Sequence, residues 1–288
     1  MKIEILHRTS YLYETPALDS VNEVRLTPRT NYRQSCYHHE VEVTPACSLF
    51  TYEDYFGNRV HAYSVSAPHD KMTVTVKSTV VTQDREQGAG LPRLALDEQM
   101  RLMENEAFQD RYIEFLLPTD YTEQTPELQS FMKKQPVGSK EDLYAWARDL
   151  SSTIYNEFTY DPEATSVETT VKNALKLKRG VCQDYAHLMI AACRNAGMPA
   201  RYVSGYHFIG DLQGGNADFE QASHAWVEAH IPGTGWLGFD PTNNAEVNWR
   251  YIKLGHGRDY KDIVPVKGVY KGGASKLDVT VDVRLVEE

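Results

Sequence analysis

The chain has 288 residues, of which 41% are hydrophobic and 24% are charged, and its formal net charge is −10. This composition is that of an ordinary soluble protein, and the length suffices for one large or two modest domains with proper cores. The acidic balance disfavours nucleic acid and anionic membrane surfaces as partners, but it places no restriction on peptide substrates.

The N-terminus and the cysteines indicate the compartment. Residues 1–8 lack the apolar core of a signal peptide, and no apolar run approaches the ~18 residues of a membrane helix. We therefore expect a cytoplasmic protein whose four cysteines, Cys36, Cys47, Cys182 and Cys193, are free thiols. None of them has the spacing of zinc ligands, so a structural metal is not predicted.

The first part of the chain has the alternating pattern of β-strands. Polar and apolar residues alternate over 2–7, 39–44 and 72–77, and turn residues separate these runs. This spacing predicts an all-β, sandwich-like N-terminal domain over residues 1–83. The polar, glycine-bearing segment 84–92 is typical of a linker.

Helical spacing begins after the linker. Apolar residues recur at helical intervals between Leu143 and Ile154, and Ser139 is the candidate N-cap of that helix. The final segment, 276–286, alternates again and should return as a strand that closes one of the sheets. The other predicted elements are helices at 170–178 and 182–195 and strands near 200–209, 223–231 and 236–240.

A cysteine at the start of an apolar helix is the strongest sign of chemistry in the chain. The first turn of a helix has unpaired N–H groups and a partial positive charge, which stabilise a thiolate and can hold an oxyanion. Cys182 occupies this position, Gly180 lets the backbone approach closely just before it, and Asp184 places an acid in the first turn. We therefore interpret Cys182 as a nucleophile and not as a buried structural thiol.

A base and a group that orients the base follow downstream, as a reactive cysteine requires. His224 lies in the run Ser-His-Ala-Trp-Val-Glu, and Asp240 lies in the run Gly-Phe-Asp-Pro-Thr. Alternation along the strand places Ala225 and Val227 on a small apolar packing face. His224 and Trp226 then lie on the other face, free to meet the cysteine helix.

The hairpin that joins these two strands gives a test of this arrangement. A four-residue loop over 232–235 would place Asp240 on the wrong face of the sheet from His224. A loop of three or five residues, or a bulge, would place Asp240 opposite Trp226 and diagonal to His224. Glycine at 233 and 235 makes such a turn easy, so we predict the odd register.

Other candidates around this centre are secondary. Trp226 is predicted to exclude water beside His224, and Trp226, Tyr160 and Gln183 are candidate substrate-lining residues. His187 is expected to be a buried, hydrogen-bonded histidine. The segment 210–218 is either a loop that covers the cleft or a plain connector. The backbone N–H of Cys182 is expected to be one oxyanion donor, and the second donor is not predicted.

Taken together, these motifs resemble those of bacterial transglutaminase-like proteins of the papain-like cysteine-enzyme superfamily. The resemblance is carried by residues 179–187, 200–206, 223–228, 235–242, 257–260 and 268–273. Residues 1–83 are similar to the β-rich domain that often precedes this core. The resemblance implies an α+β fold in which a core at 93–288, including the C-terminal strand, packs a nucleophile helix on an antiparallel sheet. It also implies Cys182 as nucleophile, His224 as general base and acid, and Asp240 as the residue that orients His224.

The predicted reaction is acyl transfer at an amide, and the partner is a protein or peptide substrate. Hydrolysis by a cysteine protease or amidohydrolase is the first hypothesis, because water is always present and no site for a lysine amine is evident. A protein-glutamine transglutaminase or deamidase would use the same triad, and a catalytically idle peptide-binding module is a third interpretation. None of these requires a metal or an organic cofactor. Neither a nucleic acid nor a membrane is an expected partner.

Overall fold

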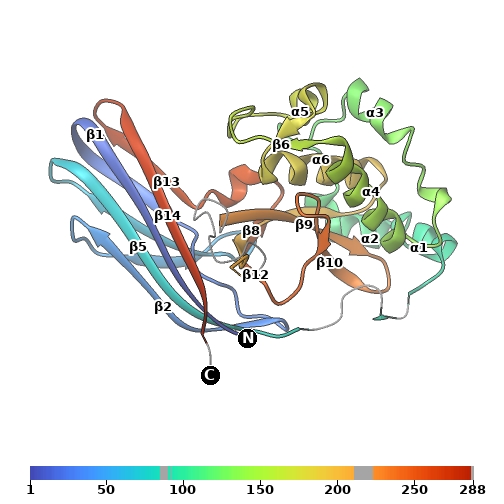
Figure 1. The fold of residues 1–288 in the computed structure, drawn as a ribbon, viewed down its shortest axis with the longest axis horizontal. Coiled ribbons are helices and arrows are strands. Elements are labelled where there is room, and N and C mark those ends of the chain that lie inside the picture. Colours follow the sequence, from blue (N-terminus) through green and yellow to red (C-terminus); the bar gives the residue numbers. More distant parts are fainter. Residues whose placement is uncertain (85–89, 92, 211–222, 287–288) are drawn as a thin grey trace.

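The computed structural model describes residues 1–84, 90–91, 93–210 and 223–286. It contains a sheet of long strands at one end and a smaller sheet covered by helices at the other (Figure 1). The predicted linker 84–92 and the predicted loop 210–218 lie largely outside the described residues. Within the described ranges, no helix combines the length and hydropathy needed to cross a bilayer.

The N-terminal sheet has seven strands organised around one very long strand, β1. The first half of β1 pairs with β5 over Lys2–Leu12 and with β14 over Lys2–Tyr13. The second half pairs with β4 over Ser20–Val24 and with β13 over Val21–Val24. Strand β1 therefore joins two halves of one curved sheet, and the predicted all-β N-terminal domain is confirmed. The strands of this sheet are β1 (Lys2–Val24), β2 (Gln34–Thr44), β3 (Phe50–Glu53), β4 (Arg59–Val65), β5 (His69–Thr82), β13 (Val266–Lys271) and β14 (Ser275–Val286).

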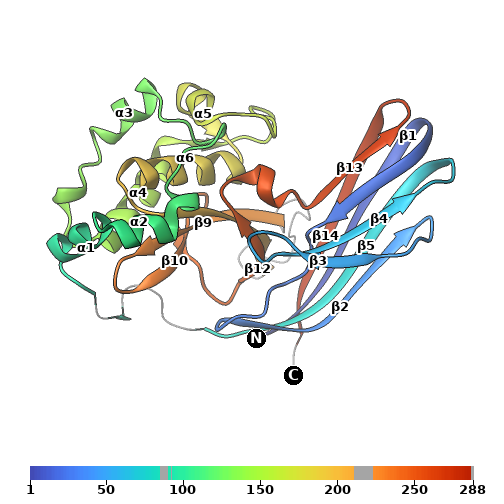
Figure 2. The ribbon, with the colours of Figure 1, turned by 180° about the vertical axis from the view of Figure 1, so that it is seen from behind.

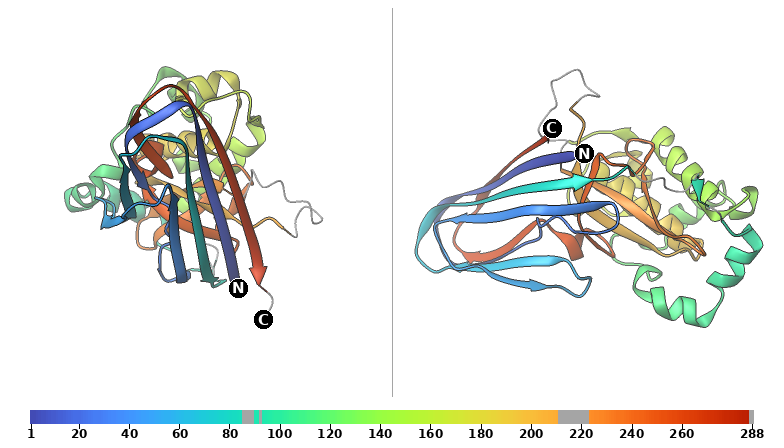
Figure 3. Two further views of the ribbon diagram at one scale, coloured as in Figure 1. Left: turned by 90° about the vertical axis from the view of Figure 1, so that its left-hand side faces the viewer. Right: turned by 90° about the horizontal axis from the view of Figure 1, so that it is seen from below.

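The C-terminal segment forms a strand, as its alternation predicted. Strand β14 runs antiparallel to β1 over its whole length, from the pair Lys2–Val286 to the pair Tyr13–Ser275. The start of β1 and the end of β14 consequently lie side by side (Figure 3). The division of the chain proposed from sequence assigned this strand to the core, whereas in the structure it completes the sheet of the N-terminal domain.

The core contains a five-stranded antiparallel sheet in the order β11-β10-β9-β8-β12. Its strands are β8 (Ala200–His207), β9 (Ser223–Ile231), β10 (Gly235–Asp240), β11 (Ala245–Glu246) and β12 (Tyr251–Gly257). The helices are α1 (Leu96–Met103), α2 (Glu106–Tyr112), α3 (Pro126–Met132), α4 (Leu143–Glu157), α5 (Val171–Leu177) and α6 (Cys182–Asn195). Figure 2 shows these helices gathered on the side of the molecule away from the long strands. The predicted α+β class is confirmed.

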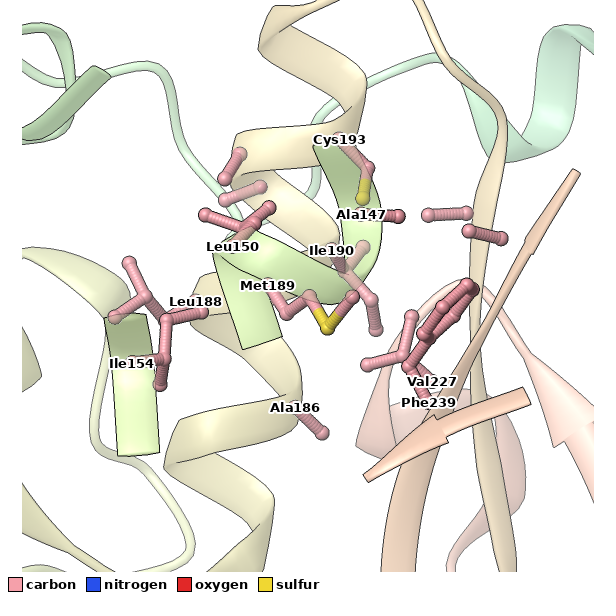
Figure 4. Close-up of a cluster of buried hydrophobic side chains, with 14 of the residues drawn as sticks. Ala147, Leu150, Ile154, Ala186, Leu188, Met189, Ile190, Cys193, Val227 and Phe239 are labelled. Atoms are coloured by element: carbon pink, nitrogen blue, oxygen red, sulfur yellow. The ribbon is translucent and has the colours of Figure 1, made fainter. Parts of the chain in front are cut away.

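Helix α6 packs on the small apolar face that alternation in β9 predicted. Ala225, Val227, Ala229 and Ile231 are at most 3% exposed and form one core with α6 and α4. Figure 4 shows Met189 and Ile190 of α6 pointing toward Val227 and Phe239. The body of the cysteine helix thus covers the apolar face, and His224 on the opposite face can meet only its N-terminal end. The expected meeting of His224 with the cysteine helix therefore takes place at Cys182, the first residue of α6.

The N-cap of α4 also differs from the prediction. The helix begins at Leu143, and the Asp142 carboxylate accepts the backbone N–H of Ala145 at 2.7 Å. Ser139 instead ends a short 3-10 turn over Val137–Ser139. A cap must directly precede the first helical residue for its side chain to reach the third helical N–H, so Asp142 and not Ser139 is the cap.

Candidate active site

The start of helix α6 is held by a short network around the carboxylate of Asp184. One of its oxygens accepts the backbone N–H of Val181 at 2.9 Å and the hydroxyl of Thr165 at 2.7 Å. Burial raises the pKa of Asp184, and these two hydrogen bonds act against that rise. Just ahead of the helix, β7 (Arg179–Gly180) pairs in parallel with β6 (Thr159–Tyr160). These contacts fix Cys182 as the first helical residue, with Tyr160 nearby.

Glycine at 180 is required by the Asp184 side chain. A Cβ at this position would collide with the carboxylate, whereas a Cβ at Gly138 would meet nothing within 4 Å. We expect Gly180→Ala to lower the free energy of unfolding by about 1–3 kcal/mol through this overlap. Gly138→Ala is the matched control and should change stability little. Urea denaturation monitored by circular dichroism measures both, and equal midpoints for the two variants would contradict the role given to Gly180.

The hairpin between β9 and β10 has the odd register that the sequence predicted. Ile231 pairs with Gly235 and Val227 pairs with Phe239, which leaves the three-residue loop 232–234. Continued by one residue, this register places Asp240 opposite Trp226 and on the face of His224. Gly233 and Gly235 have φ angles of 80° and 107°, values that L side chains rarely adopt, so glycine is needed to make this turn.

Asp240 is fully buried and accepts hydrogen bonds on both oxygens. Its Oδ2 accepts His224 Nε2 at 2.7 Å, Tyr251 Oη at 2.8 Å and Asn243 Nδ2 at 2.6 Å. Its Oδ1 accepts the backbone N–H groups of Thr242 at 2.9 Å and Asn243 at 3.3 Å. Burial alone would raise the pKa of Asp240, but the charge of His224 and these hydrogen bonds hold it well below its usual range. The carboxylate is therefore ionised and fixed in orientation.

His224 connects Asp240 to the cysteine. Because Nε2 is bound to Asp240, Nδ1 is the ring nitrogen left for Cys182, whose side chain interacts with His224. Burial would lower the pKa of His224, but the charge and hydrogen bond of Asp240, reinforced by Cys182, outweigh burial and raise it. The order sulfur, imidazole, carboxylate can hold a thiolate–imidazolium pair and transfer a proton at Nδ1.

A cavity of about 310 Å³ opens beside His224. Tyr160 lines this cavity, together with Tyr155 and Asn243. Trp226 is not among the described lining residues: it is 1% exposed and lies next to the His224 ring at a centroid distance of 6.3 Å. Gln183 is also buried, and its side chain donates to the carbonyl of Val167 at 3.0 Å. Of the three substrate-lining candidates, only Tyr160 is therefore at the cavity wall.

Three neighbours of the site were not identified from the sequence: His207, Tyr251 and Asn243. The His207 ring stacks on Tyr251 at 4.2 Å and lies 5.6 Å from the His224 ring. Burial lowers the pKa of His207 to about 4, so this imidazole is neutral at pH 7. Gly205 of β8 pairs with His224 of β9, and His207 lies two residues beyond Gly205 on the same face of the sheet. The missing signal was the pairing of β8 with β9 and of β12 with β8, which alternation within one strand does not give.

The same residues contain a group with the geometry of metal ligands. One donor atom each from His207, His224 and Asp240 lie within 4.8 Å of one another. However, the His224 and Asp240 atoms already form a 2.7 Å hydrogen bond with each other, so an ion at this place would have to replace that bond. The hydrogen bond explains why His224 and Asp240 lie together, and His207 is held beside them by its stacking on Tyr251.

His187 lies five residues beyond Cys182 on the inner side of α6. It is 1% exposed, it accepts the backbone N–H of Tyr260 at 3.2 Å, and its ring stacks with Tyr121 at 4.7 Å. Burial lowers its pKa to about 3. The prediction of a buried, hydrogen-bonded histidine is confirmed.

Comparisons with known proteins match both parts of the chain. The transglutaminase-like superfamily matches residues 131–241, and the bacterial transglutaminase-like N-terminal region matches residues 3–81. An uncharacterized protein of Mycobacterium leprae is 39% identical over 289 residues, which cover 98% of each chain. The crystal structure of a candidate cysteine protease from Cytophaga hutchinsonii superposes with a TM-score of 0.78 at 24% identity, over 100% of this chain and 91% of that one. A protein-glutamine gamma-glutamyltransferase of Pseudomonas aeruginosa is 36% identical over 93 residues, which cover 30% of this chain and 13% of the relative.

Proposed function

Because the chain belongs to the transglutaminase-like superfamily, with the bacterial N-terminal region ahead of the core, we propose that it is a cysteine-dependent amide hydrolase acting on proteins or peptides. One observation carries the proposal. The Cys182 side chain at the start of α6 interacts with His224, and His224 hydrogen-bonds to the buried carboxylate of Asp240 at 2.7 Å. In this proposal the three residues are nucleophile, general base and acid, and orienting group.

The first half of the reaction forms a thioester. The S–H proton of Cys182 passes to His224 Nδ1, and the sulfur attacks the carbonyl carbon of the amide while the π electrons move to oxygen. The backbone N–H of Cys182 has no carbonyl partner within the helix because it is the first helical residue, so it is free to donate to the oxyanion. When the C–N bond breaks, His224 Nδ1 returns its proton to the departing amine.

The second half releases the acyl group. Water gives a proton to His224 Nδ1 and attacks the thioester carbon, and the C–S bond breaks as the carboxylic acid leaves. The sulfur then receives the proton and the thiol is restored. Asp240 keeps the ring in the tautomer and orientation that both halves need, and buried Trp226 excludes water from one side of the imidazole.

A second candidate is a protein-glutamine transglutaminase or deamidase. The observation that favours it is the 93-residue similarity to a protein-glutamine gamma-glutamyltransferase. In that reaction the amide is a glutamine side chain and ammonia is the leaving group. A lysine amine then resolves the thioester in cross-linking, and water resolves it in deamidation. The first half of the chemistry, through Cys182 and His224, is the same.

Mass spectrometry of a peptide library separates these reactions. We expect the native protein to produce new peptide termini, and Cys182→Ala to produce none because it lacks the sulfur that forms the thioester. Conversion of glutamine to glutamate, or incorporation of an added primary amine, would instead favour the second candidate. The same product profile from both samples would reject an enzyme that uses Cys182 and would favour an idle peptide-binding module.

A further inference from the structure

The face of the sheet that carries His224 carries a second polar cluster further along. Arg201 of β8 pairs with Glu228 of β9, four residues along the strand from His224. A small apolar cluster that includes Val203 and Trp226 lies between the two polar regions. This second region, here called the basic cavity, is lined by Arg29, Arg201, Glu228, Trp236, Lys253 and His256.

The basic cavity has a volume of about 460 Å³ and lies where the N-terminal domain meets the core. Arg29 comes from the N-terminal part, and its backbone N–H donates to the carbonyl of Lys253 at 3.0 Å. The side chains of Arg201, Glu228 and Lys253 are 15%, 17% and 10% exposed. The charged groups are therefore largely withdrawn from water, yet they face a hollow and not packed protein.

Positive charge exceeds negative charge around this hollow. Among the described residues that line it, three are cations, Arg29, Arg201 and Lys253, and one is a carboxylate, Glu228. Arg201 and Lys253 both donate to the same oxygen of Glu228, each at 2.6 Å. Asp54 and Glu53 also attract Arg29, but neither is among the described lining residues. Burial and the nearby Arg201 charge lower the pKa of Lys253 to about 7. The lining groups thus carry one more positive charge than negative ones when Lys253 is neutral, and two more when it is protonated.

The hydrogen bonds of Arg29 and His256 point to the same imbalance. The Arg29 guanidinium donates to neutral acceptors, Asn58 Oδ1 at 3.0 Å and the carbonyl of Phe56 at 3.4 Å. His256 lies between two guanidiniums, with Nδ1 3.5 Å from Arg29 and Nε2 3.2 Å from Arg201. Burial and the neighbouring cations hold the pKa of His256 well below its usual range. A neutral imidazole accepts at one nitrogen only, so one of the two arginines faces an N–H and lacks an acceptor there.

We propose that the basic cavity binds a small organic anion of the carboxylate or phosphate class, with at least two negative charges, and that Arg29, Arg201 and Lys253 hold it. Buried charges without partners are costly, and a bound dianion would favour the protonated form of Lys253 and balance the resulting surplus of two charges. Guanidinium groups match carboxylate and phosphate oxygens two at a time. The Trp236 ring, which lies 4.0 Å from the Arg201 guanidinium, offers an apolar wall for the carbon skeleton. The volume is within the range of about 300–1,000 Å³ that small-molecule sites have.

Isothermal titration calorimetry on the full chain tests this site with two probes, citrate and inorganic phosphate, at constant ionic strength. We expect saturable binding of one anion per chain, with acetate as the monovalent control that binds weakly. Citrate binding tighter than phosphate would assign the carboxylate class, and the reverse order would assign the phosphate class. Arg29→Gln removes one charged hydrogen-bond donor and should weaken binding about tenfold. Arg101→Gln removes the same charge from the surface of α1, where Arg101 pairs with Asp97, and should leave binding unchanged.

The proposal is overturned if neither citrate nor phosphate binds saturably, or if Arg29→Gln binds the probe as tightly as Arg101→Gln does. Circular dichroism establishes that each variant is folded before titration. Should Arg29→Gln not fold, Lys253→Met takes its place, because Glu228 then keeps Arg201 as a partner. Lys253→Met is expected to weaken binding in the same way, and unchanged affinity in that variant would equally reject the site.

Discussion

Replacing Asp240 with asparagine is expected to lower kcat for amide turnover by about 10⁴-fold, in keeping with the loss of the orienting carboxylate in other nucleophile–histidine–aspartate sites. The substitution removes the charge that raises the pKa of His224. Its amide can also present an N–H to His224 Nε2, which would favour the tautomer that places a hydrogen on Nδ1. An imidazole of that kind cannot take the proton of Cys182. The rate of product formation in the peptide-library assay, measured with a single responsive peptide, gives the effect.

Stability should fall in the same variant for a separate reason. When the NH₂ group takes the place of Oδ2 and faces His224, the Tyr251 hydroxyl and the Asn243 side-chain amide lose the acceptor that Oδ2 gave them. We expect a loss of about 1–3 kcal/mol, so the variant remains folded. The pKa of Asp240 is depressed in the folded state. The ionised carboxylate therefore adds to the free energy of unfolding at pH values above the pKa of aspartate in the unfolded chain, about 3.9, and this stabilisation is lost as the pH falls below that value. The difference in free energy of unfolding between the native protein and Asp240→Asn should therefore become smaller at acidic pH.

Asp142→Asn is the matched control for the kinetic effect. Asp142 is a buried aspartate that caps α4 and pairs with Arg93, away from Cys182 and His224. Its substitution should change kcat little, even where it lowers stability. A kcat for Asp240→Asn close to that of Asp142→Asn would rule out the orienting role of Asp240.

The sequence was most informative where a local signal and a geometric constraint agreed. Helix α6 spans the predicted residues 182–195, because Gly180 ahead of it and Gly197 behind it bound an apolar run. The odd register of the β9–β10 hairpin followed from requiring Asp240 and His224 to share a face, and glycine at 233 and 235 made the turn possible. In both cases the information lies within a few residues of the element that it predicts.

Features that depend on distant segments were not predictable in this way. Tyr251 reaches Asp240 because β12 lies beside β8, at the far side of β8 from β9, and no pattern in 251–257 reveals that order. For the same reason no pattern in the sequence brings Arg29 and Lys253 to the face of the sheet that carries Glu228. The pairing of β14 with β1 joins the two ends of the chain, which is why alternation predicted a strand at 276–286 without predicting its partner.

Arg194 carries the largest predicted effect on stability, because one buried guanidinium joins three separate segments. Its Nε and Nη1 donate to the carbonyls of Phe115 and Leu117 at 3.1 and 3.0 Å, and Nη1 also donates to the Thr122 hydroxyl at 2.9 Å. Its Nη2 donates to the carbonyls of Ala200 and Arg258 at 3.0 and 2.7 Å. Burial lowers the pKa of Arg194 to about 10, so the group is still charged at neutral pH.

We expect Arg194→Met to lower the free energy of unfolding by about 3–5 kcal/mol, since it leaves several buried acceptors without a donor. Arg101→Met, at an exposed position on α1, should change it by less than about 0.5 kcal/mol. Arg194→Lys should recover little, because an ammonium offers three donors from one atom and cannot reach acceptors that surround a planar fork. Urea denaturation of the three variants gives the comparison, and similar midpoints for Arg194→Met and Arg101→Met would refute it. Ala200 begins β8 and Arg258 follows β12, so losing the hydrogen bonds from Arg194 would destabilise the sheet that carries His224. We expect activity to fall only because fewer molecules are folded, with kcat per folded molecule unchanged.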